Sequence, residues 1–290
     1  MKVLVIGGAS YDEIIHLDKF PEPAPKTIFA RESYQTPGST GLGKALAFKK
    51  LGYDVDFIAV IAKDTYGKNI EKALAKEKVN FFPIYKDQTE RHTNILNKLG
   101  QRISIFTAVP TYDEIKAVDY ERLIKGADIV VLNIKSYCKA FISLIKTHEK
   151  PVYCDLHDYD GTDEYYKEFI ENSEYIFMSS ERIHNFQVFM KDLKKKGKKW
   201  IVCTHGQKGS TALTSDKFDT IPATKLEVVD TNGAGDNFFV GFVHGYLNDF
   251  NTEDSLLLGR ILADSCIESK EIVNTELSLE YLNKKFLETM

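Results

Sequence analysis

Residues 230–238 read Asp-Thr-Asn-Gly-Ala-Gly-Asp-Asn-Phe, a short polar segment between two apolar patterns. An apolar, β-type run ends just before it, at Val228 and Val229. After it, large apolar residues recur at helical spacing, namely Phe239, Phe242, Val243 and Tyr246. The pattern therefore predicts a strand, a tight glycine turn and a buried helix that begins near Gly233.

Such a turn is typical of an anion-binding site, because the first N–H groups of a helix lack acceptors and the helix dipole favours negative charge there. Asp236 lies in the first turn of the predicted helix, where its carboxylate would repel a bound phosphate. This position makes chemical sense if Asp236 takes the proton from a hydroxyl group that attacks the phosphate, as the catalytic aspartate of a kinase does. An acidic residue is also favoured in any first helical turn, so a four-residue motif leaves both interpretations open.

The longer stretch, Asp-Thr-Asn-Gly-Ala-Gly-Asp followed by Asn-Phe-Phe-Val-Gly-Phe, resembles the C-terminal signature of the ribokinase (PfkB-type) carbohydrate kinase family. The resemblance implies an α/β protein with a ribokinase-like three-layer fold, a mainly parallel central sheet and a small β-sheet lid. It implies that Asp236 is the catalytic base and that the N–H groups of Gly233, Ala234 and Gly235 hold the transferring phosphoryl group. It also implies ATP and Mg²⁺ as cofactors, and it allows a monovalent cation.

The composition of the chain is ordinary for a globular protein. The chain has 290 residues, of which 43% are hydrophobic and 28% charged, and no linker or repeat divides it, so we expect one domain over residues 1–290. The net charge of −4 argues against a nucleic-acid partner. The four cysteines are widely spaced, which predicts buried free thiols in a reducing compartment. Without an apolar run long enough for a signal peptide or a membrane span, we expect a cytoplasmic protein with no membrane partner.

Along the chain, short apolar runs alternate with helical patterns, which predicts a parallel sheet covered on both faces. The predicted core strands are Lys2–Ile6, Val55–Ile61, Ile129–Leu132, Val152–Asp155, Tyr175–Met178 and Trp200–Thr204. The predicted helices between them include Tyr66–Glu77, Cys138–Thr147, Asp163–Glu171 and Arg182–Lys196, the last ending in a lysine run before Gly197. Two pairs of half-exposed strands, near residues 11–34 and 90–107, alternate polar and apolar residues and predict a separate lid sheet. The predicted lid strands are Tyr11–Asp18, Ile28–Tyr34, Thr93–Asn97 and Arg102–Thr107.

Substrate contacts are predicted at the start of the chain and in the lid. Asp12 follows the first strand and its glycine turn, and ligands bind at the carboxyl ends of strands in open α/β sheets. The family has a hydroxyl-binding aspartate there. On the lid strand, His92 and Asn94 are expected either to contact the sugar from one face or to be exposed to solvent. Asp64 is expected to cap a helix.

The loop Gly38–Gly43 allows two interpretations. It fits the phosphate loop of P-loop NTPases as far as Lys44, but Ala45 replaces the hydroxyl residue and Pro37 precedes the loop. The family places its substrate-binding loop here, usually Gly-Gly-x-Gly-x-Asn, and this chain has Ser39 for the second glycine and Gly43 for the asparagine. We expect Gly38, Ser39 and Gly43 to bind substrate, and a P-loop remains the alternative.

Nucleotide contacts are expected after the strand Trp200–Thr204 and in the main motif. Thr204, Gly206 and Gly209 resemble the family's Thr-x-Gly-x-x-Gly, and Thr231 is assigned to the same site. The family's adenine-flanking helix corresponds to residues 255–268. The family's metal-organising Asn-x-x-Glu is replaced by Ser179 and Arg182, so the metal ligands stay unassigned. Arg182 could bind phosphate, Glu181 could substitute in a shifted register, or Arg182 could be a surface residue in the first turn of a helix.

The sequence thus predicts an ATP-dependent phosphotransferase that acts on a hydroxyl of a sugar or sugar-like substrate. One alternative is a nucleoside kinase of the same family, with Tyr11, Phe29 or Phe106 stacking on the base. Another is a member without catalysis that serves binding or assembly, which the lost Asn-x-x-Glu and loop asparagine favour and the intact motif opposes. The one-sided alternation of the lid strands also predicts a homodimer through the lid.

Overall fold

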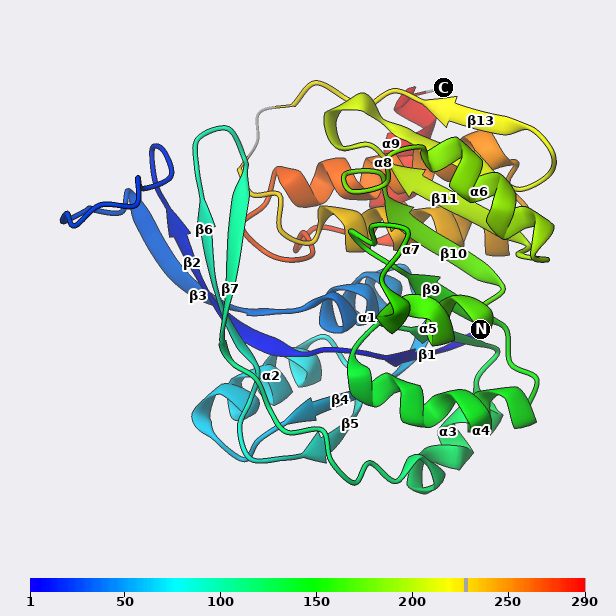
Figure 1. The fold of residues 1–290 in the computed structure, drawn as a ribbon, viewed down its shortest axis with the longest axis horizontal. Coiled ribbons are helices and arrows are strands. Elements are labelled where there is room, and N and C mark those ends of the chain that lie inside the picture. Colours follow the sequence, from blue (N-terminus) through cyan, green and yellow to red (C-terminus); the bar gives the residue numbers. More distant parts are fainter. Residues whose placement is uncertain (227–228, 290) are drawn as a thin grey trace.

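The central sheet organises the structure, a computed structural model that describes residues 1–226 and 229–289. In these residues nine strands pair in the order β13-β12-β11-β10-β9-β8-β1-β4-β5 (Figure 1). Their bounds are β1 Lys2–Ile6, β4 Asp54–Ile61, β5 Asn80–Tyr85, β8 Ile129–Leu132, β9 Val152–Asp155, β10 Tyr175–Ser179, β11 Trp200–Thr204, β12 Ser210–Leu213 and β13 Phe218–Ile221. The run from β5 to β11 is parallel, and β12 and β13 complete the sheet as antiparallel strands.

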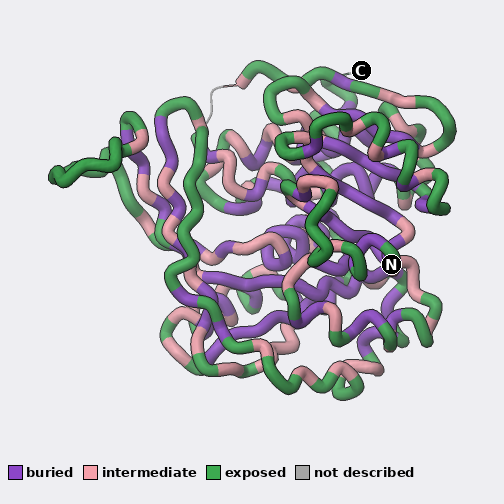
Figure 2. The backbone as a smooth tube through the Cα atoms, in the orientation of Figure 1, coloured by how far each residue is buried: buried purple, intermediate pink, exposed green. Residues whose placement is uncertain are grey.

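Helices cover both faces of this sheet, which confirms the predicted three-layer α/β fold. One apolar core joins the face of Val3 and Val5 to α1 Thr40–Lys50, α2 Thr65–Lys76, α7 Ala234–Leu247, α8 Thr252–Ile267 and α9 Leu279–Thr289. The other joins the face of Leu4 and Ile6 to α3 Glu121–Gly126, α4 Ile142–Thr147, α5 Lys167–Glu171 and α6 Phe186–Lys195. The central strands are buried along most of their length, as Figure 2 shows, and because both faces are covered these strands are mostly apolar.

The lid is a separate four-stranded sheet in the order β3-β2-β6-β7, at the left of Figure 1. Its strands are β2 Ser10–His16, β3 Glu32–Gly38, β6 Arg91–Leu96 and β7 Arg102–Ala108. The predicted lid sheet is therefore confirmed, but the predicted strand Ile28–Tyr34 is wrong in its bounds. Pairing with β2 ends where His16 meets Glu32, so Phe29 lies in an exposed loop before β3.

Several local predictions are confirmed. The Asp64 side chain caps α2 by accepting a hydrogen bond from the Gly67 N–H at 2.7 Å. Helix α6 ends at Lys195, followed by Gly197 with a φ of 86°. The four cysteines, Cys138, Cys154, Cys203 and Cys266, are buried free thiols. Over the described part of the chain, no helix has the length and apolar character that a membrane crossing requires.

Two predictions near the site are wrong. Arg182 does not lie in the first turn of a helix, because α6 begins at Phe186, where the Asn185 side chain accepts a hydrogen bond from the Val188 N–H. Val229 is not at the end of a strand: it is 40% exposed, and its N–H donates to the Ile267 carbonyl at the end of α8. Val228 lies outside the described residues.

Candidate active site

The amino end of α7 presents the predicted glycine turn. Gly233 precedes the helix with a φ of 83°, and no side chain caps this end. The Ala234 N–H donates to the Thr231 carbonyl at 3.3 Å, whereas the N–H groups of Gly233 and Gly235 have no acceptor within residues 1–226 and 229–289. These free donors at the positive end of a 14-residue helix are suited to bind an anion.

Asn237 holds this turn in place, a role that the sequence did not reveal. Its side-chain amide donates to the Gly233 carbonyl at 2.9 Å and to the Ile272 carbonyl at 2.8 Å. The side chain thus ties the start of α7 to the loop after α8. Both acceptors are main-chain atoms, so no sequence pattern indicates the contact.

Asp236 is buried in the first turn of α7 and contacts a buried lysine. The Lys44 ammonium donates to Asp236 Oδ1 and to Asp155 Oδ2, the latter at 2.9 Å. Burial alone would lower the pKa of Lys44, but the two carboxylates outweigh it and raise the pKa. The three residues come from α7, α1 and the end of β9.

The same corner gathers three groups of the type that bind metals. Asp155, His157 and Asp236 each offer a ligand atom, and these atoms lie within 4.8 Å of one another. However, Lys44 already compensates the two carboxylates, and Mg²⁺ prefers oxygen ligands to imidazole. These residues therefore do not fit a protein-held magnesium ion.

The stretch that replaces the family's Asn-x-x-Glu places no other carboxylate in the position of the lost glutamate. Arg182 is a surface residue that pairs with Asp158 at 3.6 Å and Asp160 at 3.4 Å. Glu181 is exposed, and its backbone N–H donates to Ser179 Oγ at 3.3 Å. Of the three interpretations given for this stretch, the structure agrees with the one in which Arg182 is a surface residue.

The structure brings together the residues predicted to bind substrate on the lid side. Asp12 is 2% exposed and accepts hydrogen bonds from the His92 N–H at 3.3 Å and the Asn94 side chain at 3.4 Å. His92 and Asn94 are buried, so the prediction that they face solvent is wrong. Gly38 adjoins the same carboxylate, since a Cβ there would lie 2.2 Å from Asp12 Oδ2.

An ion network around the buried Glu90, next to the Asp12 group, was not predicted. Glu90 contacts His92 Nε2 at 2.9 Å, Lys135 Nζ at 2.7 Å and the Tyr112 hydroxyl at 3.0 Å. Burial would lower the pKa of His92, but hydrogen bonds to Asp12 and Glu90 raise it to about 9. His92 is therefore an imidazolium at neutral pH, and it fixes the Asp12 carboxylate by donating to it.

This network makes stability depend on pH. The pKa of His92 is about 9 when folded, against 6.5 for an ordinary histidine, so the folded protein holds the proton more tightly. The stabilisation is complete below pH 6.5 and is lost as the pH rises through 9. We expect the free energy of unfolding to fall by roughly 2–3 kcal/mol over that range. Urea unfolding measures this, and His92→Gln should remove most of the slope; an equal slope in both proteins contradicts the assignment.

The Gly38–Gly43 loop packs against the core instead of forming a phosphate loop. A Cβ at Gly41 would lie 2.6 Å from the Gly7 carbonyl carbon, so the start of α1 touches the turn after β1. The Lys44 ammonium is fully buried and donates to two carboxylates, so it is not directed at a phosphate. The P-loop alternative is therefore wrong. Gly43 adjoins Asp236, because a Cβ there would lie 3.5 Å from Asp236 Oδ2.

Ser39 is held in a backbone conformation that glycine adopts almost exclusively, with φ 77° and ψ 152°. A non-glycine residue there costs about 1–3 kcal/mol. We expect Ser39→Gly to raise the free energy of unfolding by about 1 kcal/mol or more, measured by urea unfolding. Ser33→Gly, at an exposed position of β3, is the control and should destabilise the protein. A loss of stability in Ser39→Gly would show that the serine side chain outweighs the strain.

The residues predicted to bind nucleotide lie in two places. Thr204 ends β11, and Gly206 and Gly209 belong to the turn that follows, where Gly209 has a φ of 104°. Thr231 instead contacts the lid, because its hydroxyl donates to the Gly100 carbonyl at 3.0 Å.

Further contacts join the lid to the main motif. Arg102 of β7 donates to the Asn232 side chain at 2.5 Å, and the Tyr34 hydroxyl of β3 donates to Asp230 at 3.1 Å. The lid therefore lies closed against the segment that leads into α7.

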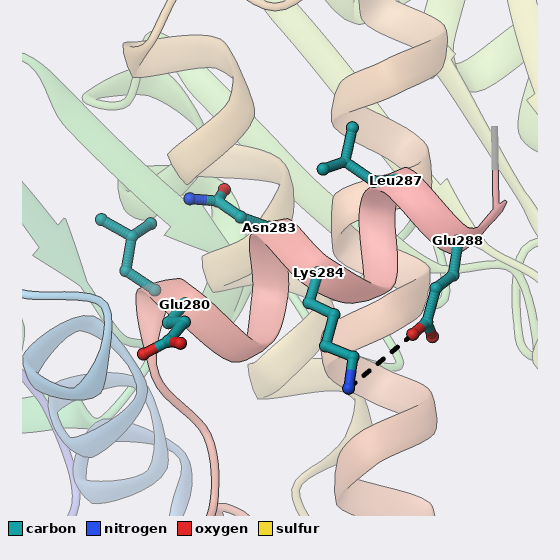
Figure 3. Close-up of a pocket in the computed structure, with 6 residues that line it drawn as sticks. Glu280, Asn283, Lys284, Leu287 and Glu288 are labelled. Carbon is teal, nitrogen blue, oxygen red and sulfur yellow. Dashed lines mark ion pairs between the residues drawn. The ribbon is translucent and has the colours of Figure 1, made fainter.

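Hollows elsewhere on the surface do not coincide with these residues. One of about 700 Å³ lies along the exposed side of α9, as Figure 3 shows. Its lining consists of Leu279, Glu280, Asn283, Lys284, Leu287 and Glu288. A second, of about 340 Å³, lies at the outer end of the lid, between His16 and Lys270. Neither hollow is lined by Asp236 or Asp12, so the candidate site is identified from the positions of its side chains and not from a surface cavity.

Comparison with known proteins identifies the family. The sequence model of the pfkB family carbohydrate kinase matches residues 1–277. A nucleoside kinase of Methanocaldococcus jannaschii is 27% identical, over 93% of this chain and 91% of the relative. A ribokinase of Lactococcus lactis is also 27% identical, over 92% and 91%. A microbiome-derived acarbose kinase has a similar structure, with a TM-score of 0.86, 23% identity and 99% of both chains covered. The chain belongs to the pfkB family of carbohydrate kinases.

Proposed function

We propose that this protein transfers the γ-phosphoryl group of ATP to a hydroxyl group of a sugar or sugar-like substrate. The observation that carries the proposal is Asp236, a buried carboxylate in the first helical turn, next to free backbone donors. A phosphate-binding turn has no need of an adjacent carboxylate, whereas phosphoryl transfer to an alcohol needs a group that takes the proton.

Each part of the site then has a role. Asp12, fixed by His92 and Asn94, accepts hydrogen bonds from substrate hydroxyl groups. Asp236 takes the proton from the attacking hydroxyl, and the free N–H groups of Gly233 and Gly235 stabilise charge on the transferring group. The closed lid keeps water from competing with the substrate.

ATP binding is proposed for the segment that follows β11 and for the main motif. Thr204, Gly206, Gly209 and Thr231 are the assigned residues, and the free donors before α7 suit the terminal phosphate. Because Asp155, His157 and Asp236 do not fit a protein-held Mg²⁺, we propose that magnesium arrives bound to the nucleotide phosphates.

A sugar suits the site better than a nucleoside does. Of the three aromatic residues considered as base platforms, Tyr11 packs on Tyr66 with ring centres 5.8 Å apart and Phe29 is 89% exposed. Phe106 packs on His92 at 4.1 Å and is the one that adjoins the Asp12 group. A nucleoside remains the second candidate because of Phe106.

A screen of ADP formation tests the function. Purified protein receives MgATP and, one at a time, pentoses, hexoses, oligosaccharides and nucleosides, with ATP alone as the control for hydrolysis. We expect substrate-dependent ADP formation with a sugar and little with ATP alone. Turnover with nucleosides alone favours the second candidate. Tight binding of a sugar without turnover would support the non-catalytic alternative and contradict the proposal.

We also propose a homodimer through the lid. Ile15, Ile95 and Ile103 lie side by side in register on the outer face of the lid, and Ile105 extends the row on β7. Ile103 and Ile105 are 42% and 46% exposed. An apolar sheet face of this kind is unfavourable in water unless a partner covers it.

Light scattering should therefore give twice the mass of the chain, and Ile105→Lys should shift the protein toward the monomer. Val188→Lys is the matched control, because Val188 is an exposed apolar residue of α6, away from the lid. A monomer at high concentration, or a dimer that tolerates Ile105→Lys, contradicts the lid interface.

A further inference from the structure

Lys44 is an unusual residue for the middle of a protein core. It is 0% exposed, and its ammonium lies 5.1 Å from the centre of the Phe239 ring, between α1 and α7. Removing an ammonium from water carries a large desolvation penalty, which only good ionic and hydrogen-bonding partners offset. Its partners here are the carboxylates of Asp155 and Asp236.

The two carboxylates are not equivalent. Asp155 is also held from the other side, because the His157 N–H donates to Asp155 Oδ1 at 2.9 Å and His157 Nδ1 lies 3.4 Å from Asp155 Oδ2. Asp155 therefore acts as an anchor for the ammonium. Asp236, in contrast, accepts a hydrogen bond from Lys44 through Oδ1 alone. No group in residues 1–226 or 229–289 donates to its Oδ2.

The free oxygen adjoins Gly43, where a side chain is absent. A Cβ at that position would be 3.5 Å from Asp236 Oδ2, so glycine leaves this oxygen approachable. One oxygen of Asp236 is thus fixed and the other is open. This arrangement suits a base, which must remain ionised and present one oxygen to a hydroxyl group.

We propose that Lys44 is a positioning residue that, anchored by Asp155, fixes Asp236 in the orientation in which it accepts the substrate proton. The inference rests on the proposed function of Asp236 as the base. Lys44 itself touches neither substrate nor nucleotide in this account. Its loss should therefore lower kcat and leave the Michaelis constants for sugar and ATP nearly unchanged.

The test compares Lys44→Met with Lys50→Met, using the sugar identified by the screen. Lys50 is the matched control, since it lies on the same helix and pairs with Glu77 at 3.5 Å, outside the site. We expect Lys44→Met to lower kcat by about 10²-fold, as a misplaced catalytic group does, with both Michaelis constants within about threefold of the parent. Lys50→Met should keep the parent kcat.

Chemical rescue separates positioning from a structural role. In Lys44→Ala, added ethylammonium should occupy the vacated space and restore kcat by about tenfold or more, whereas tetramethylammonium, which has no N–H donor, should not. Failure of ethylammonium to raise kcat in the folded variant overturns the proposal. So does parent-like kcat in Lys44→Met, or a loss of ATP affinity with kcat retained.

If the single variants do not fold, the double variant Lys44→Met, Asp155→Asn decides the matter, because it removes one positive and one negative charge together. A folded double variant with parent-like kcat overturns the proposal, and one with kcat lowered by about 10²-fold supports it. If the parent itself transfers no phosphoryl group, the proposed function fails first. An active parent with an equally active Lys44→Met contradicts this inference alone.

Discussion

Replacing Asp236 by asparagine is expected to lower kcat by about 10²–10⁴-fold while ATP binding stays nearly intact. Asparagine has the same shape but cannot take a proton, and it leaves the Lys44 ammonium with one carboxylate. The N–H groups of the turn are main-chain atoms, so the variant keeps its phosphate-binding donors. Steady-state kinetics gives kcat, and calorimetric titration with ATP gives the affinity.

Asp249→Asn is the matched control, because Asp249 is an exposed residue just after α7. It should leave kcat at the parent value. Comparable rates for Asp236→Asn and the parent would remove Asp236 as the base, whatever the nucleotide affinity.

The second large effect is expected from Gly233→Ala. The φ of 83° costs a residue with a Cβ about 1–2 kcal/mol. The Cβ would also lie 2.7 Å from the Ile272 carbonyl oxygen, and relieving such an overlap costs about 1–3 kcal/mol more. We therefore expect a loss of about 2–5 kcal/mol in the free energy of unfolding, with activity lost as the turn shifts.

Gly235→Ala provides the comparison for stability. A Cβ there meets nothing within 4 Å, and alanine is favoured over glycine in a helix by about 1 kcal/mol. This variant should unfold at the same urea concentration as the parent or a higher one. Equal stabilities for the two variants would show that the turn does not require glycine at position 233.

The layered fold was predictable because its signals are local. Each core strand is a short apolar run, and Val3 and Leu4 could be assigned to buried faces without knowing their neighbours. The bounds of β3 were not predictable in the same way. They depend on its register with β2, in which Glu32 pairs with His16, and register is a property of two strands together.

In the candidate site, too, the residues with local sequence signals were predictable and the contacts between distant segments were not. Asp12, His92 and Asn94 could be proposed from strand ends and alternation, and they do lie together. The contact of Lys44 with Asp155 spans 111 residues of sequence, and nothing near Lys44 indicates it. The lysine fitted a phosphate-loop pattern instead. Ion pairs between distant segments appear only when the fold brings them together.

The ionic partners of Glu90 illustrate the same limit. Lys135 follows β8, whereas Glu90 precedes β6 of the lid, so the pair joins the core to the lid. Each residue alone reads as an ordinary surface charge. The burial of Glu90 becomes apparent only in the fold, where Glu90 bridges to Ser10 at the start of β2, directly after the turn that follows β1.

Phosphorus-31 NMR of the reaction mixture tests the central claim most directly. With the sugar from the screen and MgATP, the parent protein should convert the γ-phosphate resonance of ATP into one new phosphomonoester resonance, in step with the appearance of ADP. Asp236→Asn should yield this product at least about 10²-fold more slowly. ADP with inorganic phosphate and no phosphomonoester, for every sugar and nucleoside tried, would contradict the account.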